Sequence, residues 1–525
     1  MRAGFPPPDL VLINGKIITL DKKTKIAEAL AVHEGKILLV GSSTEIDKLT
    51  DAKTQCIDLK GKSVLSGFID AHTHVDLVGI MTSELVVDCH IPPLRSVNDI
   101  LEKIREKTFT TPKGELIIGQ GRWAQPYPTR KQLDQVAPDH PVLIKNTMHS
   151  YWLNSSALKR FNITKDRPTS KELFEADPGG IIYRNPKTGE PTGFVDEAWN
   201  YLFPQSHSPF SYEQTQSALK EGLNKYSSLG VTTITEFVDF FESPMVYQDL
   251  RKKGELNVRL HIIPCIHGLQ KTADFDSIIG LGLTTGFGDE WIKFGGIKIF
   301  VDRGIETSLA SIQLKEWVMK AHRHGIRVFM HANTRKGQDM ALEAIEAAVE
   351  EMPEQNLRHR IEHMGNRLID LNYFDRVKKS GSIALPTAYF MNIGRTFQEG
   401  QKIFLFRTML DKGLCVPGNS DTGGTEPEAP NPLYQIWCMA ERKDREGKAV
   451  YPEERITVEE GLQLYTIHSA FACLEENIKG SIEPGKLADL VILENDPLTA
   501  YPSDLKDIKV DITIVGGKIV YRRTW

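Results

Sequence analysis

Gly67-Phe68-Ile69-Asp70-Ala71-His72-Thr73-His74-Val75-Asp76 is the segment from which the rest of the chain can be interpreted. Its apolar first half continues the run Ser63-Val64-Leu65-Ser66, which predicts a buried strand. Residues i and i+2 of a strand point the same way, so His72 and His74 would present two imidazoles side by side at its end. Such a pair can bind one metal ion, but it can equally be two hydrogen-bonded structural histidines. Whether the pair binds a metal depends on whether further ligand residues lie at the ends of the later strands.

Length and composition indicate a large globular protein. The 525 residues exceed the usual size of one core, so we expect a large domain with an accessory domain or large insertions. A formal net charge of -5 is too small to indicate nucleic acid or an anionic membrane as a partner. The N-terminus lacks the apolar core of a signal peptide, and no window is long and apolar enough for a transmembrane helix. The six cysteines include no Cys-x-x-Cys pair, so reduced thiols are expected. We therefore expect a cytoplasmic protein with a small-molecule substrate, and self-association into a homo-oligomer is left open.

Both ends of the chain are rich in short apolar runs and tight turns. Asn14-Gly15 predicts a hairpin between 9–13 and 16–20, and the pattern recurs at 29–41 and 488–521. Small sheets have exposed edges that are usually paired, so we predict that residues 1–62 and 471–525 fold together into one β-sandwich domain. Separate small sheets remain the alternative.

Residues 63–470 are expected to form an α/β domain inserted between the two ends. From Ser211, which opens a helix with the capping box Ser211-Tyr212-Glu213-Gln214, strands alternate with helices. This alternation predicts a closed parallel (β/α)8 TIM barrel, with its active site at the carboxyl ends of the strands. A doubly wound open sheet is the alternative, but no Gly-x-Gly-x-x-Gly follows the first strand. The stretch at about 85–209 is expected to be an insertion near the barrel mouth, with loops or an edge hairpin at 161–192. Strands are predicted at 116–119, 141–144, 230–236, 258–264, 295–301, 326–331, 358–363, 383–386 and 413–418, and helices at 97–107, 309–324 and 340–351.

Polar side chains recur where the predicted strands end. Four imidazoles, one carboxylate and one lysine amine would meet at one edge of the sheet, where they are costly to desolvate without a cation. Nitrogen and oxygen donors of this kind favour zinc or a similar divalent ion. The residues are His72, His74, Lys298, His331, His363 and Asp421.

Each of these residues also has an ordinary structural explanation. Lys298 could belong to a buried ion pair, His331 could be a hydrogen-bonded core residue, and Asp421 could cap a loop or a helix. His363 could form a structural pair with Glu362. These explanations must all coincide at consecutive strand ends, so we favour a metal site for the set as a whole.

Several motifs resemble those of the amidohydrolase superfamily. Phe68-Ile69-Asp70-Ala71-His72-Thr73-His74, Lys298, His331, Glu362-His363 and Ser420-Asp421 are similar to its signature. The stretches 133–142, 149–155, 191–193 and 479–489 resemble the branch that includes N-substituted formamide deformylase. The resemblance implies a metal-dependent hydrolase with a (β/α)8 barrel and a β-sandwich made from both chain ends.

The resemblance also implies roles for the candidate residues. It implies a centre with one or two divalent ions, zinc being favoured, and with Lys298 carboxylated so that its carbamate bridges two ions. His72, His74 and Asp421 would bind the more buried ion, and His331 and His363 the other. Two departures leave the substrate open, because Asn333-Thr334-Arg335 replaces an expected Gly-Asp loop after His331, and Arg303 interrupts an expected Asp-Gly.

We expect hydrolysis of a carbon–nitrogen bond, in an amide, N-formyl or N-acyl group of a small molecule, by a metal-activated water. Asp421 would act as general base and then as general acid. His149 could contact the substrate carbonyl or be structural, and Trp123, Tyr127 and Trp152 could wall an apolar pocket or be plain core. The alternatives are a metal-dependent decarboxylase or isomerase on the same barrel, and a non-catalytic binding protein that has kept the fold.

Overall fold

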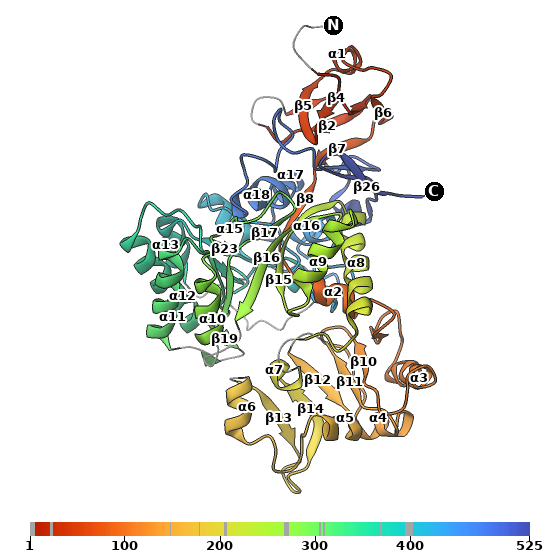
Figure 1. Cartoon of the computed structure of the whole chain (residues 1–525), viewed down its shortest axis with the longest axis vertical. Coiled ribbons are helices and arrows are strands. Elements are labelled where there is room, and N and C mark those ends of the chain that lie inside the picture. The colour runs from red at the N-terminus through yellow and green to blue at the C-terminus, as the bar shows by residue number, and fades with distance from the viewer. Residues whose placement is uncertain are drawn as a thin grey trace.

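The computed structural model describes residues 6–21, 25–146, 149–177, 179–203, 207–266, 272–303, 306–307, 310–367, 370–393 and 403–524. Figure 1 shows three regions along the longest axis: strands from both chain ends at the top, a parallel sheet with its helices in the middle, and residues of the predicted insertion at the bottom.

A curled parallel sheet forms the middle region. Its strands follow the order β23-β22-β21-β18-β16-β15-β8, with β17 beside β16. Most of these strands are buried along their whole length, as expected for a parallel sheet that helices cover. The predicted strands of this region are confirmed except the last, and β17 was not predicted. The strands are β8 (Phe68–Thr73), β15 (Val231–Val238), β16 (Arg259–Ile266), β17 (Ile292–Phe294), β18 (Ile297–Phe300), β21 (Val328–His331), β22 (Arg360–Glu362) and β23 (Ile383–Leu385).

Some helices around the sheet begin at a residue whose side chain caps them. The Ser211 hydroxyl accepts from the backbone N–H of Gln214, which confirms the predicted capping box. Helix α12 begins earlier than predicted because the side chain of Thr334 caps it. The helices around the sheet are α2 (Val75–Met81), α8 (Tyr212–Ser228), α9 (Ser243–Lys252), α10 (Thr272–Gly280), α11 (Ser311–Arg323), α12 (Arg335–Glu351), α13 (Asn372–Ser380), α14 (Tyr389–Asn392), α15 (Phe406–Asp411), α16 (Pro432–Glu441), α17 (Val458–Gln463) and α18 (Ser469–Ala472).

The strand predicted at 413–418 is wrong. Pro417 has no N–H to give to a ladder. The N–H of Val416 donates to a ring nitrogen of His468 at 3.0 Å, and the N–H of Gly418 donates to the Leu464 carbonyl at 2.8 Å. Both partners lie in the π-helix η4 (Leu464–His468), so these two N–H groups bond to a helix and not to a neighbouring strand.

The hairpin predicted at Asn14-Gly15 is also wrong. Strand β1 (Leu10–Ile13) lies in a four-stranded sheet of order β5-β4-β1-β6, whereas β2 (Lys16–Ile18) lies in a six-stranded sheet of order β26-β25-β24-β7-β2-β3. Asn14 has φ 56°, and its carbonyl accepts from the N–H of Gly61 at 2.7 Å. The turn therefore carries the chain from one sheet to the other.

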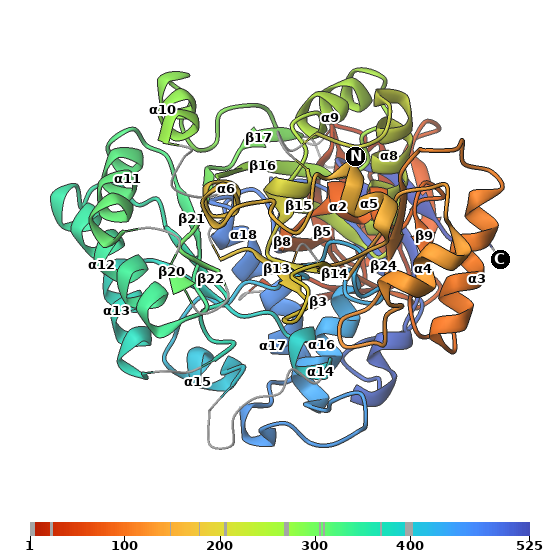
Figure 2. The ribbon, with the colours of Figure 1, turned by 90° about the horizontal axis from the view of Figure 1, so that it is seen from below.

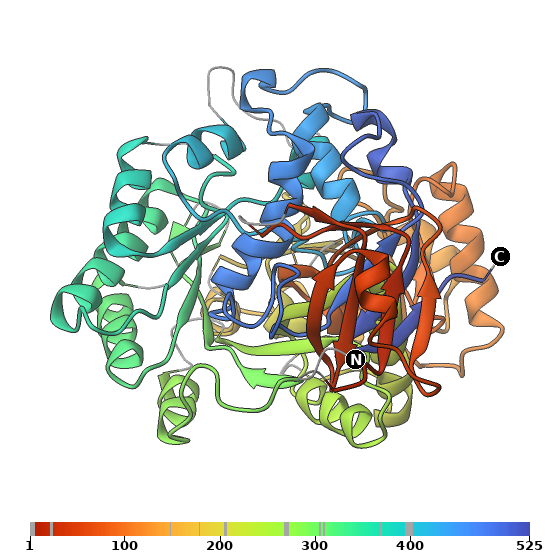
Figure 3. The same cartoon turned by 90° about the horizontal axis from the view of Figure 1, so that it is seen from above.

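The two chain ends share one of these sheets. Strand β7 (Ser63–Ser66) pairs with β2 on one side and with β24 (Leu490–Leu493) on the other. One hydrophobic cluster combines side chains from both ends, among them Leu12, Val32 and Ile514. Figure 3, seen from above, shows the terminal strands next to one another. The other strands are β3 (Ile26–Ala27), β4 (Ala29–His33), β5 (Lys36–Gly41), β6 (Gln55–Asp58), β25 (Val510–Val515) and β26 (Lys518–Arg522).

A separate six-stranded sheet, of order β13-β14-β12-β11-β10-β9, occupies the stretch predicted as an insertion. The expected edge hairpin is β13 (Ile181–Arg184) with β14 (Pro191–Asp196). Seen from below in Figure 2, this region lies across the central sheet. The remaining elements are β9 (Val87–Asp88), β10 (Ile117–Gln120), β11 (Val142–Lys145), β12 (Ser150–Leu153), α3 (Val97–Thr108), α4 (Arg130–Val136), α5 (Ser155–Arg160), α6 (Ser170–Ala176) and α7 (Trp199–Leu202).

All six cysteines lie within the described ranges, and each is a free thiol. None of the helices in the part of the chain that the structure describes combines the length and the apolarity that a membrane crossing needs.

Candidate metal centre

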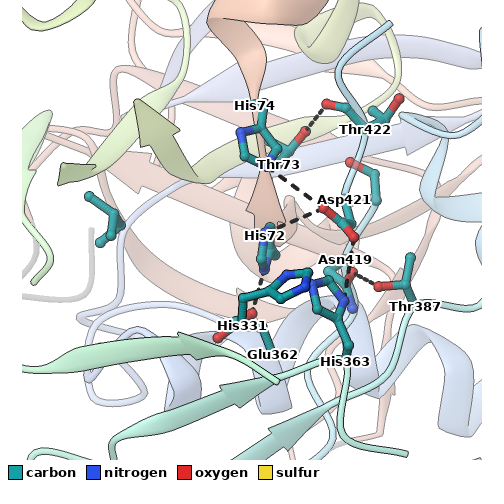
Figure 4. Close-up of polar contacts among 12 residues, drawn as sticks. His72, Thr73, His74, His331, Glu362, His363, Thr387, Asn419, Asp421 and Thr422 are labelled. Carbon is teal, nitrogen blue, oxygen red and sulfur yellow. Dashed lines mark hydrogen bonds and ion pairs between the residues drawn. The ribbon is translucent and has the colours of Figure 1, made fainter. Parts of the chain in front are cut away.

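His72 and His74 meet Asp421 at the carboxyl end of β8. Each of the three residues offers a ligand atom, and these atoms lie within 4.8 Å of one another. The Asp421 Oδ1 atom is 3.4 Å from His72 Nε2 and 3.7 Å from His74 Nε2. In Figure 4 both imidazoles are directed toward the Asp421 carboxylate. The geometry thus brings together residues that the sequence separates widely.

The backbone explains why Asp421 lies beside β8. Its N–H donates to the His72 carbonyl at 2.7 Å, and the N–H of Ala71 donates to the Gly418 carbonyl at 3.0 Å. Asp421 adopts φ 38°, a left-handed backbone conformation that is uncommon for residues other than glycine. The segment that fails to form a strand therefore still runs along β8 and delivers a carboxylate to the histidines.

The other three predicted ligands line the same cavity. His363, with φ 72°, places Nδ1 3.5 Å from Asp421 Oδ2, and the rings of His331 and His363 are 4.5 Å apart between centroids. Lys298 is buried in β18, with Nζ 4.5 Å from the centroid of the Phe237 ring. All six candidate residues therefore surround one space. Their roles as ligands stay a prediction.

The donor set fits a cation. His72 Nδ1 is hydrogen-bonded to Glu362 Oε2, and an ionised carboxylate can only accept, so the proton is on Nδ1 and Nε2 carries a lone pair. Among the described residues His72 Nε2 has no hydrogen-bond partner, although it is buried. Two lone-pair donors, His72 Nε2 and Asp421 Oδ1, thus face each other at 3.4 Å. A metal ion between them would satisfy both.

Carboxylates behind the histidines fix their orientation. His74 Nδ1 is 2.6 Å from Asp239 Oδ2, which leaves Nε2 toward Asp421. Glu362 is held in turn by the guanidinium of Arg360, through two bonds of 2.7 Å. Such outer partners set the tautomer and raise the basicity of a ligand. Neither Asp239 nor the link from Glu362 to His72 is among the residues predicted from the sequence. Asp239 directly follows β15, so its place at a strand end is the signal that indicates it.

Two further buried carboxylates hold the chain after His74. The Glu236 carboxylate accepts from the N–H of Val75 at 2.6 Å and of Asp76 at 3.0 Å, at the start of α2. Asp76 accepts from the backbone of Asp239 at 2.9 Å. Helix α2 therefore begins at a defined point, and His74 is fixed with it.

Burial shifts the pKa values of two candidate ligands. It lowers the pKa of His72 well below its ordinary value, and the positive charge of Lys298 adds to this effect. Burial also lowers the pKa of Lys298, although Glu362 opposes the shift. A neutral imidazole and an amine shifted toward its neutral form are the states needed for metal binding and for reaction with carbon dioxide.

The cavity wall is partly aromatic. Phe300, Tyr389, Phe390 and Ile393 come from the central region, and Trp123 comes from the insertion. Tyr127 and Trp152, the other candidate wall residues, instead stack on each other with ring centroids 3.6 Å apart and pack on the core of the insertion.

His149 also lines the cavity, with Nδ1 2.8 Å from Glu197 Oε1. This places it where a substrate could contact it. Its catalytic role stays a prediction.

The first departure from the family pattern lies at the cavity. Asn333 lines it and brings its amide nitrogen to 3.0 Å from His331 Nε2. The Asp302 carboxylate accepts from the N–H groups of Asn333 and Thr334, which holds this loop at the start of α12. The second departure, Arg303-Gly304, is only partly described, since the Arg303 side chain and Gly304 lie outside the described residues.

The chain and its fold are similar to those of known metal-dependent hydrolases and related proteins. The chain is 29% identical to N-substituted formamide deformylase of Arthrobacter pascens, over 98% of this chain and 99% of that protein. Its fold is similar to an uncharacterized metal-dependent hydrolase from Pyrococcus horikoshii OT3, with TM-score 0.73, 22% identity and coverage of 94% of this chain and 99% of that one. It is also similar to the atrazine chlorohydrolase TrzN from Arthrobacter aurescens TC1 complexed with zinc, with TM-score 0.55, 14% identity and coverage of 97% and 94%.

These comparisons confirm the predicted enzyme class, a metal-dependent hydrolase of carbon–nitrogen bonds, and do not favour the decarboxylase or isomerase alternative. Residues 55–521 match the amidohydrolase family. This match covers most of the chain, including all six candidate ligands. The chain therefore belongs to the amidohydrolase family.

Proposed function

We propose that this protein hydrolyses the amide bond of a small N-formyl or N-acyl compound with an apolar substituent. The observation that carries the proposal is the approach of His72 Nε2 and Asp421 Oδ1, two lone-pair donors 3.4 Å apart in a buried site. The aromatic cavity wall suits an apolar substituent. The similarity to a formamide deformylase supports an N-formyl group as the first to test.

His72, His74 and Asp421 would hold one divalent ion, and His331 and His363 a second. Zinc is the proposed metal because the donors are imidazole and carboxylate, and because one structural neighbour contains zinc. The Lys298 amine would add to carbon dioxide and release one proton, which would leave a carbamate with one negative charge as a further ligand group. A bound divalent ion would polarise the scissile carbonyl and lower the pKa of a water molecule toward neutrality.

Asp421 is placed to move the proton. Its carboxylate would accept the proton from the attacking water and then donate it to the leaving nitrogen. His149, which lines the same cavity, would contact the carbonyl side of the substrate. The aromatic wall would exclude bulk water, which strengthens each electrostatic contact in the site.

We further propose that the central sheet closes into a (β/α)8 barrel over residues 63–470, with the insertion at about 85–209. The 416–421 segment supports closure because it bonds to β8 and also reaches the end of β23, where Asn419 Nδ2 donates to the Pro386 carbonyl at 2.7 Å. Residues 1–62 and 471–525 would form a β-sandwich domain, which their shared sheet and hydrophobic cluster support. The cytoplasm is the proposed location.

The test combines metal analysis with a panel of N-formyl, N-acyl and aromatic amides in oxygen-18-labelled water. Hydrolysis puts the label into the released acid, whereas decarboxylation or isomerisation does not. We expect the purified protein to retain a divalent ion and to release labelled formate or carboxylate, and the His72→Ala variant to lose both properties. A folded protein that binds no divalent ion, or that cleaves no amide when metal is bound, would refute the proposal.

A further inference from the structure

Glu426 is a buried acid in the cavity wall, and the proposed hydrolysis gives it no role. Its relative exposure is 2%, and it lines the same cavity as the candidate ligands. A buried carboxylate is costly unless both oxygens are hydrogen-bonded, so the partners of each oxygen matter.

The two oxygens of Glu426 differ in their partners. Oε2 accepts from Arg122 Nη1 at 2.7 Å and also from Arg445 Nη2. Oε1 is buried and has no hydrogen-bond partner among the described residues. Burial raises the pKa of Glu426 although Arg445 and Arg122 oppose the shift, so its ionised form is incompletely compensated. A hydrogen-bond donor placed at Oε1 would give this oxygen the partner that it lacks.

The charges around Glu426 indicate which donor fits. Arg122 also binds Glu428, with Nη2 2.9 Å from Oε1. Two guanidinium groups thus face two carboxylates, and the formal charges of Arg122, Arg445, Glu426 and Glu428 cancel. A neutral O–H or N–H donor preserves this balance, whereas an ammonium group would leave one buried charge unpaired.

The other residues of the cavity wall indicate which part of the substrate carries the O–H or N–H group that would bond to Glu426. Trp123, Phe300 and Phe390 supply aromatic surface to the cavity that Glu426 and the candidate ligands also line. The scissile amide would lie at the ligands, so the donor that reaches Glu426 belongs to the substituent.

We propose that Glu426 Oε1 accepts a hydrogen bond from a neutral O–H or N–H group on the substituent, so that the enzyme selects aromatic amides bearing such a donor. This inference rests on the proposed amide hydrolysis and assigns Glu426 as a specificity-determining residue. A site built to pair with a substrate donor discriminates strongly against the analogue that lacks it, because the acceptor is then left unpaired.

The test uses N-benzylformamides with a hydroxyl at the 3- or 4-position, their methyl ethers and their aminomethyl analogues. Binding is measured calorimetrically with metal-loaded Asp421→Asn enzyme, and turnover with metal-loaded wild type. We expect one hydroxyl compound to bind about 10- to 100-fold more tightly than its methyl ether. Glu426→Gln should abolish or invert this preference, because its amide can present a donor to the cavity.

Glu428→Gln is the matched control, since it disturbs the same Arg122 but leaves Oε1 of Glu426 in place. The preference should survive in this variant. Equal binding of every hydroxyl compound and its ether, a preference unchanged in Glu426→Gln, an equal loss in Glu428→Gln, or tightest binding of an aminomethyl compound would each overturn the inference. If wild type hydrolyses none of the formamides or other amides, the proposed function fails, and the binding series still decides the inference about Glu426.

Discussion

Asp70 and Ser420 lie 350 residues apart in the sequence and are joined by two hydrogen bonds. The Ser420 N–H donates to Asp70 Oδ1 at 3.0 Å, and the Ser420 hydroxyl donates to Oδ2 at 2.5 Å. Asp70 lies within β8, and Ser420 directly precedes Asp421. This buried clamp therefore holds the segment that carries Asp421 against the strand that carries His72.

Asp70→Asn should loosen this clamp, because an amide nitrogen would face one of the two Ser420 donors. Each buried donor left unpaired costs about 1–3 kcal/mol. We expect at least a tenfold loss of turnover and weaker metal retention, measured by steady-state kinetics and metal analysis. Asp375→Asn, an exposed carboxylate paired with Lys412, is the control. Unchanged turnover and metal content in Asp70→Asn would show that the clamp does not position Asp421.

Asp421→Asn should abolish turnover while metal is retained. The amide oxygen can still bind a cation, but it cannot accept the proton from the attacking water. General-base catalysis contributes about 100- to 10,000-fold, so we expect a loss of that size in kcat. Turnover and metal content are measured on the same preparation, and near-normal hydrolysis would remove Asp421 from its assigned role.

Asp239→Asn should weaken metal binding without removing a ligand. The Asp239 carboxylate fixes His74 through Nδ1, and loss of such an outer partner typically lowers metal affinity about 10- to 100-fold. The affinity is measured by competition with a chelator. Asp276→Asn, a surface carboxylate paired with Lys320, should leave the affinity unchanged. An unaltered affinity in Asp239→Asn would mean that His74 keeps its orientation by other contacts.

The sequence predicts which residues meet at the candidate site better than it predicts the details of the fold. His72, His74, His331 and His363 end or directly follow apolar runs, so their meeting at one edge follows from parallel strands. The partner of each histidine could not be predicted in this way. Glu362 binds His72 across 290 residues of sequence, and no local periodicity specifies which acid reaches which imidazole.

The wrong predictions have a similar cause. Asn14-Gly15 has the local chemistry of a hairpin turn, yet the groups at the turn bond to Glu28 and Gly61. Residues 413–418 have the apolar character of a strand, but the N–H groups of Val416 and Gly418 bond to η4. In both cases distant segments supplied the partners, and tertiary contacts overrode the local preference.

His468, which bonds to the segment before Asp421, should make the stability of the folded protein depend on pH. Burial lowers the pKa of His468 from 6.5 to about 4, while Nδ1 accepts from the N–H of Val416. Between these values the unfolded chain binds more protons than the folded one, so stability falls as the pH falls through this window. The contribution is fully present above about pH 6.5 and amounts to at most about 3 kcal/mol.

His468→Gln should therefore flatten the dependence of unfolding free energy on pH between about 6.5 and 4. Denaturant unfolding across this range measures the slope, and the difference between variant and wild type isolates His468 from the other buried histidines. His324→Gln, at an exposed position, should keep the wild-type slope. If His468→Gln and wild type lose stability in parallel as the pH falls, the ring of His468 is not held neutral by its burial against the 413–418 segment.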